Sequence, residues 1–286
     1  PLVASVGGFT ANIALNYLFV YGFGMGIAGS AWGTVIAQTG MAAALVTVLI
    51  RYAVRTRLRL HPHPGRVLGA ARHGIPLLIR TLALRAALLT TVWVAAGLGD
   101  VPLAAHQVAA TVWSFLAFAL DALAIAAQAL TGKALGAGDV EGVRSATRLM
   151  IRWGIGLGVL LGAAVLVLHR VLPPLFTPDA SVQGAIAAAL VVVALSQPIS
   201  GYVFVIDGVL IGADDGRWLA RAGVAVYSLY LPLIGAVHLL APTTGAVWSA
   251  PVAVTWLWVA FTGFMVLRGI ALGLRVRTTR WMVTGV

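Results

Sequence analysis

Four ionisable side chains lie inside long apolar runs, where such residues are rare. Asp121 and Asp207 each lie in one run, and Arg80 and Arg85 share another. Charges at membrane depth are costly, so they usually face a bundle interior or a wet cavity and pair with one another. From their depths along the runs, at about 1.5 Å per residue, we predict that Arg85 pairs with Asp121 and Arg80 with Asp207.

Two kinds of chemistry are open to these carboxylates. In the first, one of the carboxylates exchanges protons or a cation during transport. In the second, both pairs are static clamps that fix helix register, and Arg80 extends to the interface. For Asp207 both interpretations stay open, whereas for Asp121 we favour the clamp. Further polar side chains within apolar runs add hydrogen-bonding groups that we expect to line a cavity or to bridge helices: Gln107, Gln128, Gln197 and Tyr202.

Enzymatic chemistry finds little support in the sequence. There is no cysteine, which excludes disulfides and thiolate metal sites. His61 and His63 flank Pro62 in a basic loop, which is too few ligands for a metal site. The sequence shows no nucleophile–base pairing, no zinc-protease motif and no phosphate loop. We therefore expect no enzyme activity, no metal and no cofactor.

The elements that must position the four charges are membrane-spanning helices. Apolar residues form 60% of the chain and charged residues only 9%, so lipid must be the solvent for most of it. A span needs about 20 apolar residues. This length predicts an all-α polytopic bundle of about eight transmembrane helices, near residues 3–21, 29–50, 75–97, 102–131, 150–172, 181–212, 218–240 and 244–267.

The formal net charge of +11 does not indicate nucleic-acid binding, because the basic residues lie in short loops between apolar runs. Alternate loops carry most of them, and the positive-inside rule places those loops in the cytoplasm. We expect both ends of this chain to be cytoplasmic. Arginine outnumbers lysine and alanine is abundant, which favours a GC-rich bacterial source and its plasma membrane.

Three stretches carry a resemblance to a known family. They begin at Asn12-Ile-Ala-Leu-Asn16, at Leu103-Ala-Ala-His-Gln107 running into Asp121-Ala-Leu-Ala-Ile-Ala-Ala-Gln128, and at Asp207-Gly-Val-Leu-Ile-Gly-Ala-Asp214. In this order the stretches resemble the multidrug and toxic compound extrusion (MATE) family, in particular its DNA-damage-inducible protein F branch. The match covers nearly the whole chain.

The resemblance implies a fold of twelve helices in two six-helix lobes. The eight spans then correspond to helices five to twelve, and we expect a fragment that lacks the first four. Residues 1–50 would be the remainder of the N-terminal lobe, 51–74 a basic cytoplasmic loop, 75–267 the C-terminal six-helix lobe, and 268–286 a cytoplasmic tail.

The resemblance also implies cation-coupling residues. The N-lobe cation site of the family corresponds here to Asn12, Asn16 and Thr34, and Asn16 replaces an Asp of many relatives. This departure puts a Na⁺ site in the N-lobe in doubt. The family's acidic residue on the tenth helix matches Asp207. Some relatives have an acidic residue on the seventh helix, where this chain instead has Arg80 and Arg85, which makes the C-lobe less attractive to cations.

The function implied is antiport: H⁺ or Na⁺ flows inward and cationic, amphipathic small molecules leave the cell. The alternative is a flippase for lipid-linked saccharides, in which Arg80 and Arg85 would hold a diphosphate. A non-transporting scaffold is a third class, but it has no need of four buried charges. We expect a monomer in the lipid bilayer, with no nucleic-acid partner. We also expect that these 286 residues alone do not transport.

Overall fold

The computed structural model of the protein describes residues 2–56, 64–243 and 248–284. Every regular element within these ranges is a helix, which confirms the predicted all-α class. The chain forms two compact units, unit 1 (Pro1–Val67) and unit 2 (Leu68–Val286), and each is described by itself. The division falls inside the predicted inter-lobe loop, of which residues 57–63 lie outside the described part of the chain.

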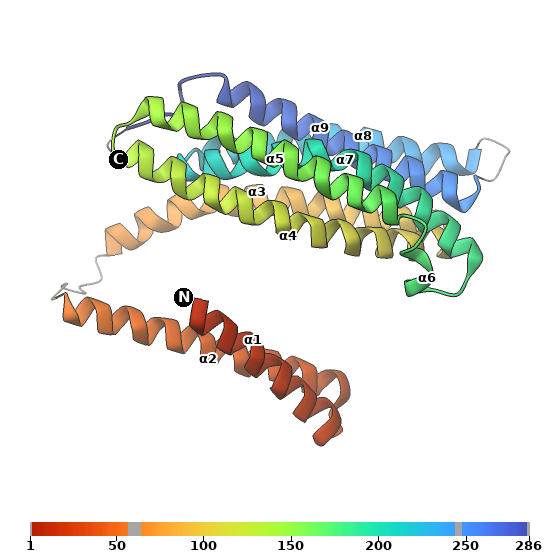
Figure 1. Ribbon diagram of the computed structural model, residues 1–286, viewed down its shortest axis with the longest axis horizontal. Helices are drawn as coiled ribbons and strands as arrows, with labels where there is room; N and C mark the ends of the chain where they lie inside the picture. The colour runs from red at the N-terminus through yellow and green to blue at the C-terminus, as the bar shows by residue number, and fades with distance from the viewer. Residues whose placement is uncertain (1, 57–63, 244–247, 285–286) are drawn as a thin grey trace. The chain divides into compact units, whose positions relative to one another are not determined.

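Unit 1 is a helical hairpin (Figure 1). Helix α1 (Leu2–Tyr17) continues into a π-helical turn, η1 (Leu18–Gly22), and α2 spans Gly26–Arg55. Gly24 and Gly26 adopt positive φ values of 65° and 55°, which glycine tolerates because it has no Cβ. The glycines therefore make the tight turn between the two helices.

Unit 2 contains α3 (Pro64–Gly97, apart from its first turn), α4 (Asp100–Gly136), α5 (Val140–Leu168), the short α6 (Pro173–Phe176), α7 (Ala180–Gly212), α8 (Gly216–Thr243) and α9 (Ala250–Val276). Helix α7 is central and packs against α4, α5 and α9 (Figure 1). It is apolar on every side and largely buried, as expected of a helix surrounded by other helices.

The described residues contain seven helices long and apolar enough to cross a membrane, namely α2, α3, α4, α5, α7, α8 and α9. The first of the eight predicted spans is the exception. Its α-helix, α1, is only 16 residues long and then changes to the π-helical turn. Asn12 and Asn16 also interrupt the apolar run of this segment.

Close packing of α5 on α7 depends on the glycines of α5. Gly154, Gly158 and Gly162 are buried against the backbone of α7. A Cβ atom at Gly158 would lie 2.9 Å from the Cα of Pro198, nearer than real Cβ contacts allow. Small residues at such positions let membrane helices approach closely. Pro198 cannot donate to the carbonyl four residues earlier, that of Ala194, and this carbonyl faces Gly162.

Helices α3 and α8 are joined by two hydroxyl pairs. The Oγ1 of Thr91 lies 2.7 Å from the phenol oxygen of Tyr230, and the Oγ1 of Thr90 lies 3.1 Å from that of Tyr227. Tyr230 is fully buried. Hydroxyls inside a membrane bundle need protein partners because lipid supplies none, so these pairs fix the rotation of α3 against α8.

The first residues of the predicted tail, 268–286, belong to a helix in the structure. Helix α9 continues to Val276, which places Arg268 inside a membrane-length helix. Arg275 lies in the last turn of α9, where its guanidinium donates to both carboxylate oxygens of Asp215, at 2.6 and 3.2 Å. It also lies over the ring of Trp218. The Arg275–Asp215 ion pair therefore links the end of α9 to the turn between α7 and α8.

Candidate functional site

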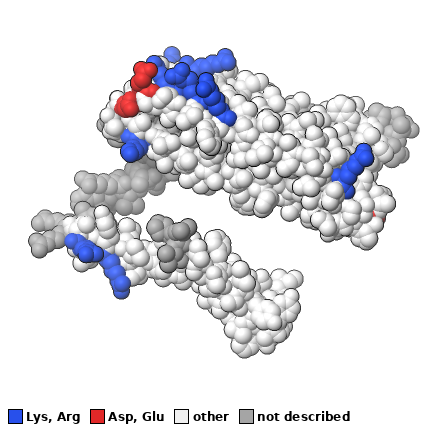
Figure 2. Space-filling view, viewed as in Figure 1, with Lys and Arg blue, Asp and Glu red and all other residues white. Residues whose placement is uncertain are grey.

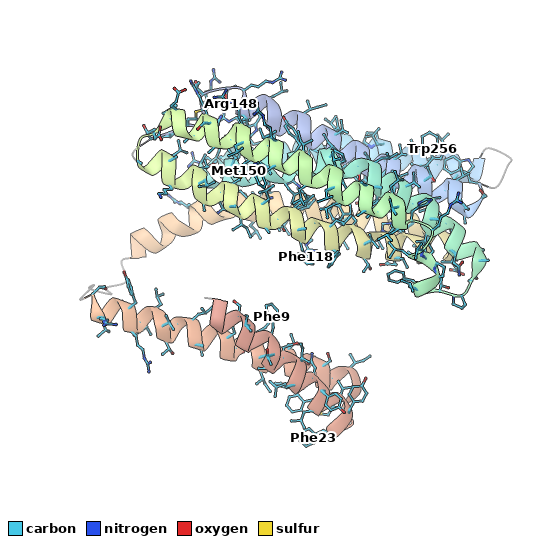
Figure 3. The ribbon with its side chains drawn as sticks, viewed as in Figure 1. Phe9, Phe23, Phe118, Arg148, Met150 and Trp256 are labelled. Atoms are coloured by element: carbon cyan, nitrogen blue, oxygen red, sulfur yellow. The ribbon has the colours of Figure 1, made fainter. Side chains whose placement is uncertain are left out.

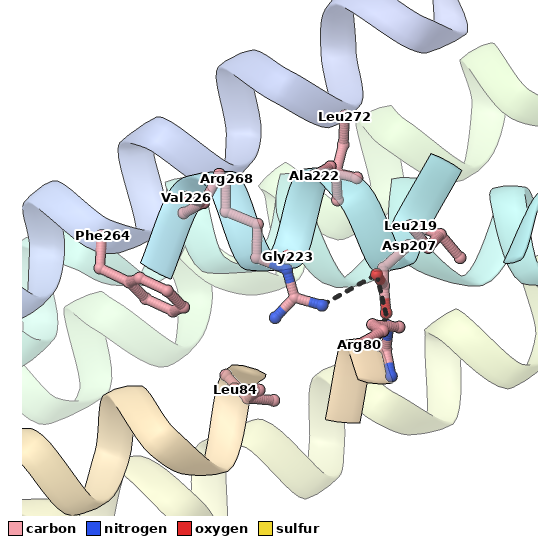
Figure 4. Close-up of a pocket in the computed structure, with 10 residues that line it drawn as sticks. All are labelled: Arg80, Leu84, Asp207, Leu219, Ala222, Gly223, Val226, Phe264, Arg268 and Leu272. Atoms are coloured by element: carbon pink, nitrogen blue, oxygen red, sulfur yellow. Dashed lines mark hydrogen bonds and ion pairs between the residues drawn. The ribbon is translucent and has the colours of Figure 1, made fainter. Parts of the chain in front are cut away.

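Asp207 lies in the central helix α7 and is 5% exposed. The Nε of Arg80, on α3, donates to its Oδ1 at 3.0 Å, and the Nη2 of Arg80 forms an ion pair with its Oδ2. The Nη2 of Arg268, on α9, donates to Oδ1 at 2.8 Å. One carboxylate thus joins three helices (Figure 4). The Arg80–Asp207 pair is the one predicted from depth, and Arg268 is an unpredicted third member.

Buried charges are stable only when they are paired and hydrogen-bonded. Asp207 meets this condition with bonds from two guanidinium groups, which neutralise it from two sides. Arg268 is 8% exposed and has no other carboxylate within ion-pairing distance among the described residues. In this conformation, proton uptake by Asp207 would require the loss of at least one charge-assisted bond. The geometry therefore supports the clamp interpretation for Asp207.

Next to this cluster is a cleft of about 270 Å³ between α3, α4, α7 and α9. We call it the arginine cleft. Its ionisable lining residues are Arg80, Arg85, Arg268, Asp121 and Asp207. The formal charge of this set is +1, from three arginines and two aspartates. The structure thus brings together all four ionisable residues that the sequence singled out.

The predicted pairing of Arg85 with Asp121 is not formed. Both side chains line the arginine cleft and both are exposed, but the described residues contain no hydrogen bond or ion pair between them. Asp121 is therefore the accessible carboxylate of the cleft, and Arg85 is its accessible arginine. The geometry therefore favours Asp207 as the clamp, whereas the sequence favoured Asp121 for that role.

Aromatic side chains form much of the remaining lining. Trp113 and Phe118 come from α4 and Phe204 from α7. Trp113 is buried and packs edge-on against Phe261, with ring centroids 5.2 Å apart. Phe118 is 72% exposed and projects from α4 (Figure 3). A cleft with an accessible carboxylate and aromatic faces can bind an organic cation by charge and by cation–π contact.

The predicted cavity residues outside the four charges do not line the arginine cleft. Gln107 and Gln128 are exposed on α4. Gln197 is 1% exposed, and its Nε2 donates to the carbonyl of Val193 in its own helix. Tyr202 packs on Gly269 and Gly273 of α9. Tyr202 thus contacts a neighbouring helix, whereas Gln197 bonds within its own helix.

Unit 1 holds the residues matched to the N-lobe cation site. The Nδ2 of Asn16 donates to the Oδ1 of Asn12 at 3.1 Å, so the two amides share one face of α1. The Oδ1 of Asn16 is buried without a partner among the described residues. Thr34 donates to the carbonyl of Ser30 in its own helix. This geometry leaves one amide oxygen available but no carboxylate.

Arg268 is the residue that sequence reasoning missed. It was counted with the basic residues after the last span, where a positive charge is ordinary. The apolar run continues beyond it, through Gly269-Ile-Ala-Leu-Gly-Leu274. That continuation was the available signal, since an arginine with apolar residues on both sides lies within a span, as Arg80 and Arg85 do.

A family model described as MatE matches residues 76–234, more than half of the chain. The chain belongs to the MatE family. The matched region of this MatE-family chain includes Arg80, Asp121 and Asp207, whereas Arg268 lies after it. Together with the seven membrane-length helices, the match shows a multi-pass membrane protein of a transporter family.

Relatives come from plants and bacteria. The chain is 30% identical over 276 residues to Protein DETOXIFICATION 43 of Arabidopsis thaliana, covering 94% of this chain and 49% of the relative. It is 29% identical over 287 residues to DNA damage-inducible protein F of Escherichia coli, covering 95% and 58%. The eukaryotic MATE transporter AtDTX14 has the same fold, with a TM-score of 0.80 at 23% identity, covering 98% and 62%. The MatE-family chain thus spans about half the length of these curated relatives.

Proposed function

We propose that this chain forms part of a cation-coupled antiporter that exports cationic, amphipathic small molecules, with the arginine cleft as a substrate site. Membership of the MatE family supports export. The observation that carries the proposal is the environment of Asp121. This exposed carboxylate has no hydrogen bond or ion pair within the described part of the chain, and it lines the same cleft as the aromatic rings of Phe118 and Phe204.

In this proposal the two aspartates have different roles. Asp121 is the group for which the coupling cation, H⁺ or Na⁺, and the substrate compete. Asp207 is a positioning residue that holds Arg80 and Arg268 and so keeps α3, α7 and α9 in register. Asp207 accepts hydrogen bonds from both guanidinium groups, and Asp121, which forms none with them among the described residues, remains available to a cation.

We assign the complete transporter to a bacterial plasma membrane, as a monomer with both ends of this chain on the cytoplasmic side. The support is the arginine-rich composition, the Escherichia coli relative and the grouping of basic residues in alternate loops. Lys133, Arg144 and Arg217 lie within the end turns of α4, α5 and α8, and Arg277 directly follows α9, all at one end of unit 2. Figure 2 shows a large group of basic side chains at that end of unit 2 and a smaller basic patch at the opposite end.

The test is ethidium efflux from vesicles that contain the complete transporter, driven first by a pH gradient and then by a Na⁺ gradient. We expect the wild type to export under at least one gradient and Asp121→Asn to lose that export. Asp100→Asn is the control, because Asp100 is exposed on the same helix but lies outside the cleft. Export by Asp121→Asn at the wild-type rate would contradict the role of Asp121.

A flippase for lipid-linked saccharides is the second candidate function. The observation that favours it is the formal charge of +1 in the arginine cleft, together with the accessible guanidinium of Arg85. Arginine binds phosphate oxygens with two parallel hydrogen bonds. If the wild type exports nothing under either gradient but moves a lipid-linked diphosphate across the bilayer, and Arg85→Gln abolishes this movement, the flippase replaces the antiporter.

A further inference from the structure

A second concave site is distinct from the arginine cleft and shares no lining residue with it. The first turns of α5 and the segment that follows α9 enclose a groove of about 470 Å³. We call it the basic groove, and its defining residues are Arg144, Thr147, Arg148, Arg277 and Trp281. It belongs to the end of unit 2 where basic side chains gather, and Arg148 is labelled there in Figure 3.

The basic groove carries uncompensated positive charge. Arg144, Arg148 and Arg277 are exposed, and the described residues contain no carboxylate within ion-pairing distance of them. Glu141 is the acidic residue of the lining, so the formal charge is +2. The Nε of Arg148 donates to the carbonyl of Arg144 at 3.4 Å, which leaves its terminal nitrogens available. Exposed arginines alone are ordinary at the positive end of a membrane protein, so charge does not define a site here.

Thr147 supplies an independent observation. It lines the basic groove and is only 5% exposed, yet its Oγ1 has no hydrogen-bond partner among the described residues. Other helical threonines of this chain, such as Thr81 and Thr91, donate to the carbonyl four residues earlier. Buried hydroxyls are nearly always satisfied. The hydroxyl of Thr147 therefore indicates a ligand atom that accepts its hydrogen bond.

The floor of the basic groove is apolar and continuous with a lipid-facing surface. Trp281 is 2% exposed, and its indole nitrogen donates to the carbonyl of Val276, which holds the segment after α9 in place. Ile151 lines the groove, and Ile155 and Val159, which follow it at intervals of four residues on the same face of α5, are 39% and 52% exposed. A ligand that occupies this groove thus meets cationic groups at one end and the acyl region of the bilayer at the other.

We propose that the basic groove binds the phosphate headgroup of an anionic phospholipid. The arginines pair with the phosphate oxygens, which guanidinium groups match in geometry. Thr147 donates its hydroxyl to the same headgroup, and the acyl chains lie along the exposed apolar face of α5. Basic residues at a membrane surface attract anionic lipids in any case, but the concave shape and the buried hydroxyl make this a specific site.

The test is lipid binding to the purified 286-residue chain, by native mass spectrometry with phosphatidylglycerol and phosphatidylcholine as probes. The groove variant is Arg144→Gln/Arg148→Gln. The matched control is Arg217→Gln/Arg221→Gln, which removes the same charge from exposed arginines near the same end of unit 2. Thr147→Val removes the hydroxyl without changing charge. Helical content and monodispersity are checked for each variant.

We expect the wild type to bind phosphatidylglycerol at least tenfold more tightly than phosphatidylcholine. The groove variant should lose about tenfold in phosphatidylglycerol affinity and Thr147→Val about threefold, while the control pair stays within twofold. Equal losses in the groove and control pairs would show a diffuse basic face and overturn the proposal. Competition of the lipid by millimolar glycerol phosphate would also overturn it, because the groove would then be a site for soluble phosphate.

Discussion

The Oδ1 of Asp207 and the Nη2 of Arg268 are 2.8 Å apart, although 61 residues separate them in the sequence. Arg80 contacts the same carboxylate, so the cluster links α3, α7 and α9. Removal of one partner from a buried ion pair leaves an uncompensated charge, which costs about 3–5 kcal/mol in soluble proteins. A single change in the cluster is therefore expected to destabilise unit 2 strongly.

We predict that Asp207→Asn lowers the thermal stability of the protein in detergent by an amount equivalent to about 3 kcal/mol. The amide is neutral, so Arg80 and Arg268 remain near one another without a counter-charge. Asp207→Asn/Arg268→Gln should recover part of the loss, because the double change removes one of the two arginines. A double variant less stable than the sum of the single changes would contradict the clamp.

The glycines of α5 that are buried against α7 yield a prediction with an internal control. Gly158→Ala should destabilise the protein by about 1–3 kcal/mol, the usual cost of overpacking, because its Cβ would contact the backbone of α7. Gly156→Ala should be neutral or stabilising by about 0.5–1 kcal/mol, since nothing lies within 4 Å of the added Cβ. Thermal unfolding of the two variants measures the difference. Equal effects would show that α5 and α7 are not in close contact at Gly158.

The hydroxyl pairs between α3 and α8 should contribute modestly. Tyr230→Phe removes the bond to Thr91, and we expect a loss of about 0.6 kcal/mol, as for other hydrogen bonds within membrane proteins. Thr91 keeps its bond to the carbonyl of Ala87, so no buried hydroxyl is left unsatisfied. A loss several times larger would mean that the rotation of α3 against α8 depends on this one bond.

A pH dependence is expected at Asp179, the N-cap of α7, which lies outside the spans. Hydrogen bonds from the Ser181 hydroxyl and from the backbone N–H groups of Ser181 and Val182 lower the pKa of Asp179 below its ordinary value. A lowered pKa in the folded state means that the cap stabilises α7 above the ordinary pKa and stops doing so as pH falls through the lowered value.

Asp179→Ala should therefore reduce thermal stability at neutral pH. The difference in stability between this variant and the wild type should disappear only in strong acid. Ser181→Ala should raise the pKa of Asp179, so the stabilisation by the Asp179 cap should be lost at a higher pH. The measurement is the midpoint of thermal unfolding against pH. If the midpoint of Asp179→Ala differs from that of the wild type by the same amount at all pH values, the carboxylate charge does not contribute to the cap.

Much of the fold could be predicted because a membrane helix is defined by the length of its apolar run. The order of the long helices in unit 2 and the Arg80–Asp207 pair follow from length and depth. The ends of two helices do not, because α5 begins at Val140 rather than 150 and α9 ends at Val276 rather than 267. The rotation of each helix about its axis does not, because α4 and α7 are apolar on most faces. For this reason the sequence could not decide whether Gln107 and Gln197 line a cavity or bridge helices, and Arg85 was paired with Asp121 although the two form no hydrogen bond or ion pair among the described residues.

Competition between the coupling cation and the substrate at Asp121 tests the central claim most directly. Ethidium binding to the purified complete transporter is measured by fluorescence at a series of pH values and Na⁺ concentrations. Binding to the wild type should weaken as one of the two cations is increased, and Asp121→Asn should bind at least tenfold more weakly with that dependence lost. If Asp121→Asn binds ethidium with wild-type affinity and the same cation dependence, Asp121 is not the shared site and the account is wrong.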